Sequence, residues 1–142
     1  MTMKTKPDWD RYYLDIATAV SARGDCVRAQ HGAVVVKNHK IVSTGYNGTP
    51  AGDTRSCGAT GECPRNKDAT AQHSKGDYDL CWTTHAEANA LLRASWEEMQ
   101  GATIYITGDP CLGCFKLIES AGIDYLVVPM YGGGIRSYRC RS

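Results

Sequence analysis

The chain contains 142 residues, and its 16 Lys and Arg against 15 Asp and Glu leave a formal net charge of +1. This length fits one folding unit with a sizeable core, so we expect a single catalytic domain over residues 1–142. The balanced charge disfavours a protein that holds nucleic acid through a broad basic face. No apolar run approaches the roughly 20 residues that span a bilayer, and the polar residues 1–10 do not resemble a signal peptide. We therefore expect a cytoplasmic protein without membrane contact.

Seven cysteines are many for a chain of this length. Such a number is typical either of a secreted disulfide framework or of an intracellular metal protein. The count is odd, an export signal is not expected, and the spacings are those of metal ligands. We therefore predict metal-binding thiols in a reducing compartment.

The first half of the chain contains a helix pattern and a hairpin pattern. Apolar residues recur every three to four positions over residues 9–22, which predicts a helix with one buried face. Two β-branched runs, 32–37 and 40–46, are separated by a two-residue turn and predict a β-hairpin. A turn-rich stretch, 47–52, follows. Residues 53–78 carry almost no apolar periodicity, so we expect a long loop that is held by its cysteines rather than by a core.

Helices and strands alternate in the second half of the chain. We predict one helix over residues 85–101, with Thr84 as its N-cap. A strand at 102–107, a helix at 111–121 and a strand at 123–128 follow. This order predicts an α/β domain of two or three layers, with a site between two helix N-termini.

Two short motifs carry the chemistry of the chain: His85-Ala86-Glu87 and Pro110-Cys111-Leu112-Gly113-Cys114. One histidine and two cysteines offer three ligands to a tetrahedral zinc ion and leave its fourth position open. Glu87 is then free to move a proton between a water molecule and a leaving group. A His-x-Glu motif followed by Pro-Cys-x-x-Cys is the signature of the zinc-dependent nucleobase deaminases.

Each part of this pattern also has a simpler interpretation. His85 and Glu87 on their own would be a surface histidine and a solvated acid on a helix. The Cys-x-x-Cys pair on its own could be a redox pair of the thioredoxin type. All these residues occur together at the offsets that the chemistry needs, and this combination favours the zinc site.

The remaining cysteines need a separate explanation. One explanation is that four of them are reduced thiols that act as small apolar side chains: Cys26, Cys57, Cys63 and Cys81. Alternatively, they bind a closed structural zinc, which would stabilise a glycine-rich segment that has no core of its own. We favour the structural zinc. Cys140 is left over and is predicted to be an unpaired terminal thiol.

Several segments, taken in order with the two motifs, resemble the deoxycytidylate (dCMP) deaminase family. They run from about Cys26 to Val128 and cover most of the chain. The zinc motif alone marks the wider cytidine deaminase-like superfamily, whereas the other segments indicate its nucleotide-specific branch. These segments are Cys26-Val27-Arg28, Gly32-Ala33-Val34, Ser43-Thr44-Gly45-Tyr46-Asn47-Gly48-Thr49-Pro50, Cys57, Gly61-Glu62-Cys63-Pro64-Arg65 and Leu80-Cys81.

The resemblance implies hydrolytic deamination of dCMP to dUMP and ammonia, a step of pyrimidine deoxynucleotide (dTMP precursor) metabolism. It also implies a three-layer α/β/α domain with a mixed central sheet of about five strands. His85, Cys111 and Cys114 would hold the catalytic zinc, and Glu87 would transfer the proton. The substrate residues that we expect are Asn47, Gly48, Thr49, Pro50, Gly52, Ala86 and Tyr131.

Tyr131 is predicted from its position beyond the last strand, where it could stack on the base, although an ordinary rim aromatic explains it equally well. The resemblance implies a second zinc at Cys26, Cys57, Cys63 and Cys81, for which His73 is a rival ligand. It further implies dCTP and dTTP as effectors, and a homo-oligomer that is often a hexamer.

The chain departs from the family pattern at several positions. His31 stands where relatives usually have valine, Ala29 where a second basic residue is common, and Tyr78 near a position often held by histidine. After Tyr131 the glycines and the basic tail leave too little chain for the usual final helix and strand.

Two alternatives to a dCMP deaminase stay open. The first is a deaminase of another cytosine compound, namely CMP, a 5-substituted dCMP or a cytosine in nucleic acid. The second is a zinc-stabilised binding module without catalysis, which Glu87 disfavours because such a module has no need of a carboxylate at that offset.

Overall fold

The computed structural model describes residues 5–53, 55–64 and 81–140. Its centre is a five-stranded sheet with the strand order β2-β1-β3-β4-β5. β1 is antiparallel to both β2 and β3, β3 is parallel to β4, and β4 is antiparallel to β5. The predicted mixed sheet of five strands is therefore confirmed. The strands are β1 (Gly32–Lys37), β2 (Lys40–Tyr46), β3 (Thr103–Ile106), β4 (Tyr125–Pro129) and β5 (Ile135–Arg139).

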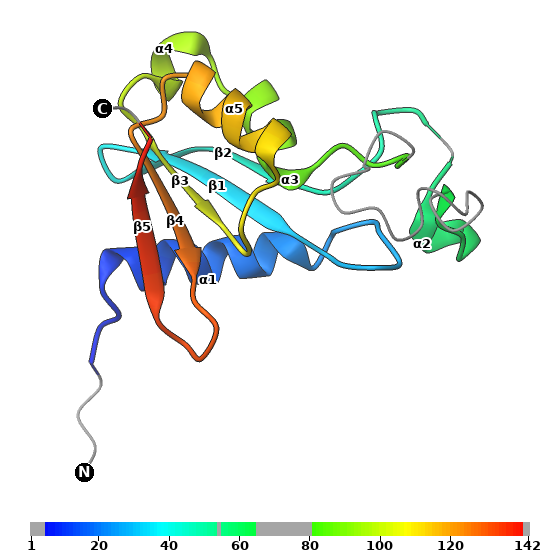
Figure 1. Ribbon diagram of the computed structural model, residues 1–142, viewed down its shortest axis with the longest axis horizontal. Helices are drawn as coiled ribbons and strands as arrows, with labels where there is room; N and C mark the ends of the chain where they lie inside the picture. Colours follow the sequence, from blue (N-terminus) through cyan, green and yellow to red (C-terminus); the bar gives the residue numbers. More distant parts are fainter. Residues whose placement is uncertain (1–4, 54, 65–80, 141–142) are drawn as a thin grey trace.

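Helices cover both faces of this sheet and complete three layers (Figure 1). α1 (Trp9–Ser21) lies on one face, and α3 (Ala86–Leu92), α4 (Trp96–Met99) and α5 (Leu112–Ser120) lie on the other. The short helix α2 (Cys57–Thr60) lies beyond one end of the sheet. Within the described part of the chain, no helix has the length and apolar character needed to cross a lipid bilayer.

The alternation of side chains along the strands divides the core in two. Val34 and Val36 of β1 pack towards α1, in the cluster that contains Tyr13. Ala33 and Val35 point the opposite way and join the cluster beneath α3 and α5. β1 is buried on both faces, which explains why its sequence is a continuous apolar run rather than an alternating one.

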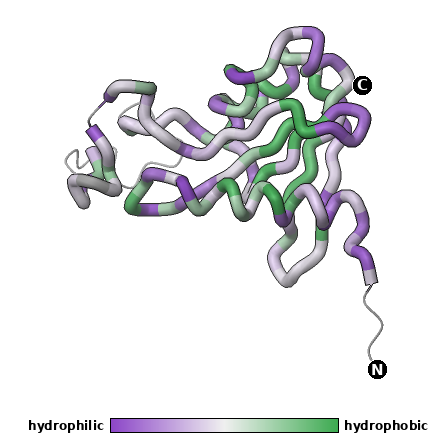
Figure 2. Tube along the Cα trace, turned by 180° about the vertical axis from the view of Figure 1, so that it is seen from behind, coloured by the Kyte–Doolittle hydropathy of each residue, from purple (hydrophilic) through white to green (hydrophobic). Residues whose placement is uncertain are grey.

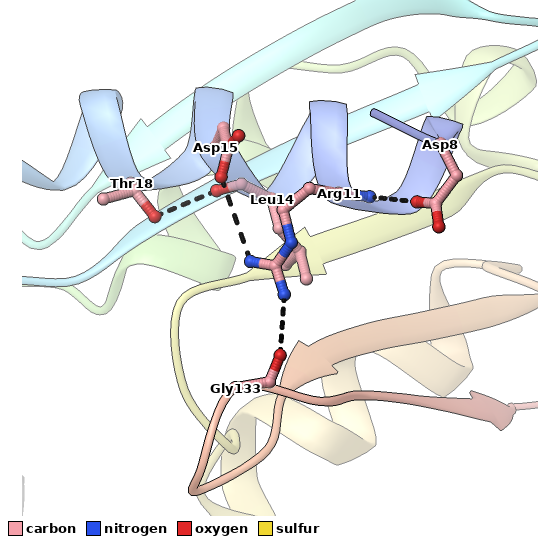
Figure 3. Close-up of polar contacts among 6 residues, drawn as sticks. All are labelled: Asp8, Arg11, Leu14, Asp15, Thr18 and Gly133. Carbon is pink, nitrogen blue, oxygen red and sulfur yellow. Dashed lines mark hydrogen bonds and ion pairs between the residues drawn. The ribbon is translucent and has the colours of Figure 1, made fainter. Parts of the chain in front are cut away.

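The prediction that the tail is too short for another strand is wrong. The chain reverses after β4 through Gly132 and Gly133, whose φ angles of 96° and 103° suit glycine, and then forms β5. Arg11 of α1 donates a hydrogen bond from Nη2 to the Gly133 carbonyl oxygen at 3.2 Å, which ties this turn to the helix (Figure 3). Because β5 is an exposed edge strand, its polar sequence carries only a weak strand pattern.

The single helix predicted over 85–101 is also wrong. α3 ends at Leu92, and a new helix starts after Ser95. The Ser95 hydroxyl accepts a hydrogen bond from the Glu98 N–H at 3.1 Å, and the Glu98 carboxylate accepts one from the Ser95 N–H at 2.9 Å. This reciprocal capping box specifies a helix start inside a pattern that otherwise reads as continuous.

Cys140 is a free thiol, as predicted, but it does not belong to a loose terminus. Its side chain is buried in the core cluster under α5. Burial raises the pKa of this thiol, and the nearby Glu119 and Asp124 carboxylates raise it further. Cys140 is therefore a core side chain.

A second part of the molecule, which we call the cysteine-bearing region, lies beyond the end of the sheet. It comprises residues 24–31, 47–53, 55–64 and 81–84 and contains α2. Figure 2 shows that most of its trace is pale or hydrophilic, in contrast to the hydrophobic strands. Cys57 and Cys63 are the only buried apolar side chains among its described residues. This finding agrees with the expectation that the region lacks a core of its own.

Candidate active site

The candidate site lies where the helices α3 and α5 begin, at the end of the sheet that faces the cysteine-bearing region. His85 is the N-cap residue of α3, in place of the predicted Thr84. Cys111 is the N-cap residue of α5, and Cys114 lies in the first turn of that helix. Two helix N-termini therefore present the histidine and the thiols to the same point, and their positive dipole ends favour the thiolate form.

These three side chains form a compact cluster. His85 Nδ1 lies 3.3 Å from Cys114 Sγ and 3.6 Å from Cys111 Sγ. The three ligand atoms all lie within 4.8 Å of one another. Among the described residues, no other set of three His, Cys, Asp or Glu side chains is this close together. One nitrogen and two sulfur atoms are the donors of a catalytic zinc site that keeps one position open.

Glu87 provides an independent test of whether a metal and a water molecule fit here. The residue is only 6% exposed, and its buried Oε2 atom has no hydrogen-bond partner among the described residues. An unsatisfied buried carboxylate oxygen is costly, so its presence points to a missing partner such as a water molecule beside a metal. Burial raises the pKa of the Cys114 thiol, and the neighbouring Glu87 adds to that effect. A bound divalent cation favours the thiolate instead, so both residues fit a zinc ion.

The first turn of α3 is held in place by β2. A Cβ atom at Gly45 would collide with the Ala86 carbonyl and the Ala90 amide, so only glycine allows this close approach. Ser43 Oγ donates a hydrogen bond to the Ala90 carbonyl at 2.7 Å, and Asn89 Nδ2 donates one to the Tyr46 carbonyl at 2.8 Å. These contacts fix the position of α3 and therefore of His85 and Glu87 relative to the sheet.

The turn that follows β2 is attached to the residue before the histidine. Gly48 and Thr84 exchange two backbone hydrogen bonds, of 3.1 and 2.8 Å, in an isolated β-bridge. The Gly-Tyr-Asn-Gly segment therefore supports the site from the side of the cysteine-bearing region. This is a structural role that its turn composition alone did not reveal.

A cavity of about 230 Å³ opens at this site. Its volume lies just below the range of about 300–1,000 Å³ that is usual for small-molecule pockets. Glu87 is a buried lining residue, whereas Arg28, His31 and Asp109 are exposed side chains. The described residues that line it are Cys26, Arg28, Ala29, His31, Asn47, Cys81, Thr83, His85, Ala86, Glu87, Asp109 and Cys111.

The predicted substrate residues divide into two groups. Asn47 and Ala86 line the cavity. The other five do not belong to its described lining: Gly48, Thr49, Pro50, Gly52 and Tyr131. Tyr131 lies in the β4–β5 turn with a fully exposed side chain, so it does not reach the cavity of its own chain.

The side chain of Asn47 is already engaged by the protein. Its Nδ2 donates a hydrogen bond to the Ala29 carbonyl at 2.9 Å, and its Oδ1 accepts one from the His31 N–H at 2.8 Å. Its backbone carbonyl also accepts a hydrogen bond from the Asp25 N–H at 2.7 Å. Asn47 therefore holds residues 25–31 against the cavity.

Sequence reasoning did not assign Arg28, His31, Thr83 or Asp109 to the site. Asp109 directly precedes the Pro-Cys-x-x-Cys motif, and this adjacency was a usable signal. His31 stood out only as a departure from the family pattern. Arg28 and His31 reach the cavity through the hydrogen bonds of Asn47, and such long-range contacts leave no mark in a local pattern.

The four remaining cysteines come together in the cysteine-bearing region. Burial raises the pKa of the Cys57 thiol, and the neighbouring Cys26 and Cys63 raise it further. Cys81 contributes in the same way, and Cys26 and Cys81 also line the cavity. No three of these sulfur atoms reach the close spacing of the His85 cluster. His73, the rival ligand, and Tyr78 lie outside the described residues.

Comparisons with known proteins agree with this geometry. The sequence profile of the cytidine and deoxycytidylate deaminase zinc-binding region matches residues 7–130. The chain belongs to this deaminase family. The match includes both chemical motifs and all four core strands β1 to β4, so the predicted membership is confirmed.

Relatives within the deaminase family carry a more specific name. The deoxycytidylate deaminase of Mycobacterium phage D29 is 45% identical over 129 residues, which cover 88% of this chain and 97% of that protein. The deoxycytidylate deaminase of Schizosaccharomyces pombe is 37% identical over 123 residues, which cover 86% of this chain. The matched part is only 37% of the length of that yeast protein.

Solved structures of two deaminases have the same fold. The dCMP deaminase of cyanophage S-TIM5, in complex with dCMP and dUMP, aligns with a TM-score of 0.64 and 28% identity. The alignment covers 89% of this chain and 84% of that one. Cytidine deaminase from Burkholderia pseudomallei aligns with a TM-score of 0.59 at 18% identity, which supports the three-layer fold alone.

Proposed function

We propose that the protein is a zinc-dependent enzyme that hydrolyses dCMP to dUMP and ammonia. The observation that carries this proposal is the buried Glu87 carboxylate, which lines the same cavity as His85 and Cys111 and whose Oε2 has no partner within residues 5–53, 55–64 and 81–140. A binding module gains nothing from an unsatisfied buried carboxylate, whereas a hydrolase uses one as a general base. The D29 relative and the S-TIM5 neighbour support dCMP as the substrate.

In the proposed reaction, His85, Cys111 and Cys114 would hold the catalytic zinc. When bound, the zinc would act as a Lewis acid and would lower the pKa of its bound water towards neutrality. Glu87 accepts the proton from the attacking water and delivers it to the pyrimidine ring nitrogen. It then takes the proton of the hydroxyl group that has been added to the ring carbon and passes it to the amine, which leaves as ammonia as the carbonyl forms. The burial of Glu87 keeps its hydrogen bonds directed at the substrate rather than at bulk water.

A structural zinc at Cys26, Cys57, Cys63 and Cys81 is the second part of the proposal. Two observations support it. The thiols of Cys26, Cys63 and Cys81 are close enough to Cys57 to raise its pKa. Cys57 and Cys63 are also the only buried apolar side chains among the described residues of the region. A closed site would stabilise the region directly. Metal analysis of the purified protein should give two zinc ions per chain, and Cys57→Ser should give one. One ion per chain in the wild type would contradict the second site.

A homo-oligomer, often a hexamer in the family, is also proposed, as are regulation by dCTP and dTTP and a cytoplasmic location. Exposed apolar side chains support association: Leu112 is 83% exposed, Leu92 is 77% exposed and Trp96 is 60% exposed. Light scattering should give several times the mass of one chain. dCTP and dTTP should shift the dCMP saturation curve in opposite directions.

A substrate panel tests the activity. Zinc-loaded protein is incubated with dCMP, CMP, deoxycytidine, a 5-substituted dCMP and a single-stranded oligonucleotide, and the release of ammonia is measured. We expect dCMP to be the fastest substrate. Activity on CMP or the oligonucleotide without activity on dCMP would overturn the proposal in favour of a deaminase of another cytosine compound.

A further inference from the structure

Two exposed basic side chains, Arg28 and His31, line the catalytic cavity. Glu87, the proposed general base, lines the same cavity and is only 6% exposed. This difference in exposure indicates that the basic pair lies towards solvent and Glu87 away from it. A ligand whose reacting carbon lies beside Glu87 would place its far end near the basic pair. If the ligand is a nucleotide, as the proposed function requires, that far end is the 5′-phosphate.

The exposed acidic group that lines the cavity does not cancel this basic character. Asp109 also lines the cavity, but both of its carboxylate oxygens lie 3.5 Å from Arg136 Nη2. Arg136 comes from β5, so the edge strand supplies a cation that offsets the Asp109 charge. Among the described residues that line the cavity, Asp109 therefore has a cation of its own beside it, and the other carboxylate, Glu87, is buried.

The backbone that carries the basic pair is held in one position. The Asn47 side chain bonds both the Ala29 carbonyl and the His31 N–H, and the Asn47 N–H donates to the His31 carbonyl at 3.4 Å. On the same segment, Gln30 Nε2 donates a hydrogen bond to the Cys26 carbonyl at 2.6 Å. A contact that is positioned before the ligand arrives loses little conformational entropy on binding.

The imidazole of His31 is oriented by Thr107 at the end of β3. Thr107 Oγ1 accepts a hydrogen bond from the Gly32 N–H at 3.1 Å, so its own hydrogen is available for another acceptor. His31 Nδ1 lies 3.5 Å away and accepts that hydrogen in the tautomer that is protonated on Nε2. In this tautomer Nε2 is a donor for the ligand.

We propose that His31 is a specificity-determining residue, whose Nε2–H donates a hydrogen bond to the 5′-phosphate of the substrate beside Arg28. The pair selects a nucleoside monophosphate over the corresponding nucleoside. The inference deepens the proposed function and rests on it. Valine, the residue that the family resemblance leads us to expect at this position, has no such donor.

Two substitutions and a remote control separate recognition from folding. His31→Val removes the donor, whereas His31→Gln keeps an amide N–H close to the position of imidazole Nε2. His39→Asn changes another exposed histidine in the β1–β2 turn, where the φ angle of 59° suits asparagine. The measured quantities are the dissociation constants of dUMP and deoxyuridine by calorimetry, and kcat and KM for dCMP.

His31→Val should weaken dUMP binding about 10-fold, which is the usual effect of losing a hydrogen bond to a charged group. Deoxyuridine binding and kcat should change less than about twofold, since neither depends on the phosphate contact. KM for dCMP should rise with the dUMP dissociation constant, and His31→Gln should restore most of the loss. His39→Asn should match the wild type.

Equal weakening of dUMP and deoxyuridine by His31→Val would show a merely structural role and overturn the proposal. Unchanged dUMP affinity, or a failure of His31→Gln to restore it, would do the same. A failure of the proposed function is a different result, because the wild type would then not convert dCMP at all. The calorimetric comparison uses the product and needs no turnover, so the two failures are distinguishable.

Discussion

The sheet with its helices and the cysteine-bearing region are stabilised by different interactions. In the first, side chains such as Ile104 and Ile118 on one face of the sheet and Tyr13 on the other face are almost completely buried. In the second, the described residues are connected mainly by hydrogen bonds of Asn47 and Asp25. The first part supplies its own hydrophobic stabilisation, whereas we propose that the second needs a metal.

The candidate site lies between these two parts and takes residues from both. His85, Glu87 and Cys111 come from helices that pack on the sheet. Cys26, His31 and Asn47 come from the cysteine-bearing region or its border with β1. Rigid packing thus positions the chemical groups, and a polar, separately stabilised region forms the entrance for the substrate.

The largest expected effect is on catalysis. Glu87→Gln keeps the shape of the side chain but removes the general base, so kcat for dCMP should fall by about 10²- to 10⁴-fold. Zinc content and the thermal unfolding midpoint should stay close to the wild-type values. Unchanged turnover at equal zinc content would show that Glu87 does not transfer the proton.

A large loss of stability is expected from the core of the sheet. Ile104→Ala removes a fully buried side chain from β3 and should lower the free energy of unfolding by about 2–5 kcal/mol. The matched control is Ile41→Ala on the edge strand β2, where the side chain is 45% exposed and the loss should stay within about 1 kcal/mol. Urea unfolding measures both, and equal losses would contradict the assignment of the core.

A smaller and more local loss is expected in the cysteine-bearing region. Asn47→Ala leaves the His31 N–H and the Ala29 carbonyl without their partner, at a cost of about 1–3 kcal/mol. Native-state hydrogen exchange should show faster exchange at residues 25–31, with β3 and β4 unchanged. Uniform acceleration across the sheet would mean that the two parts unfold as one unit.

The smallest effect is expected at the contact between α1 and the β4–β5 turn. Arg11→Met keeps the aliphatic stem but loses the hydrogen bond to Gly133 and the 3.9 Å ion pair with Asp15 (Figure 3). Both contacts are exposed, so stability should fall by less than about 1 kcal/mol. Thermal unfolding measures the change, and a larger loss would show that the turn is part of the cooperative core.

The same contrast explains what could be predicted from sequence. The strands β1, β3 and β4 carry continuous apolar patterns because they are buried, and α1 carries a periodic pattern because it buries one face. These elements and β2 occur where the patterns place them. The cluster of His85, Cys111 and Cys114 could be predicted because these residues lie at the starts of two helices. Within one helical turn, the spacing of residues in the sequence determines how their side chains are arranged in space.

The features that were missed depend on polar or long-range contacts. β5 has a polar edge sequence, and the break after α3 depends on a two-residue capping box at Ser95 and Glu98. The entrance of the cavity combines Arg28 with Asp109, which come from distant parts of the chain. Turn composition suggested that Asn47 contacts substrate, whereas its described hydrogen bonds are to the protein backbone.

Isotope transfer from water tests the central claim, hydrolytic deamination of dCMP, most directly. The zinc-loaded protein is incubated with dCMP in water enriched in ¹⁸O, and the nucleotide product is examined by mass spectrometry. We predict dUMP that carries one ¹⁸O atom on the ring carbon that lost its amine, with ammonia released in equal amount. Recovery of unchanged dCMP, or of dUMP without the heavy oxygen, would contradict the account.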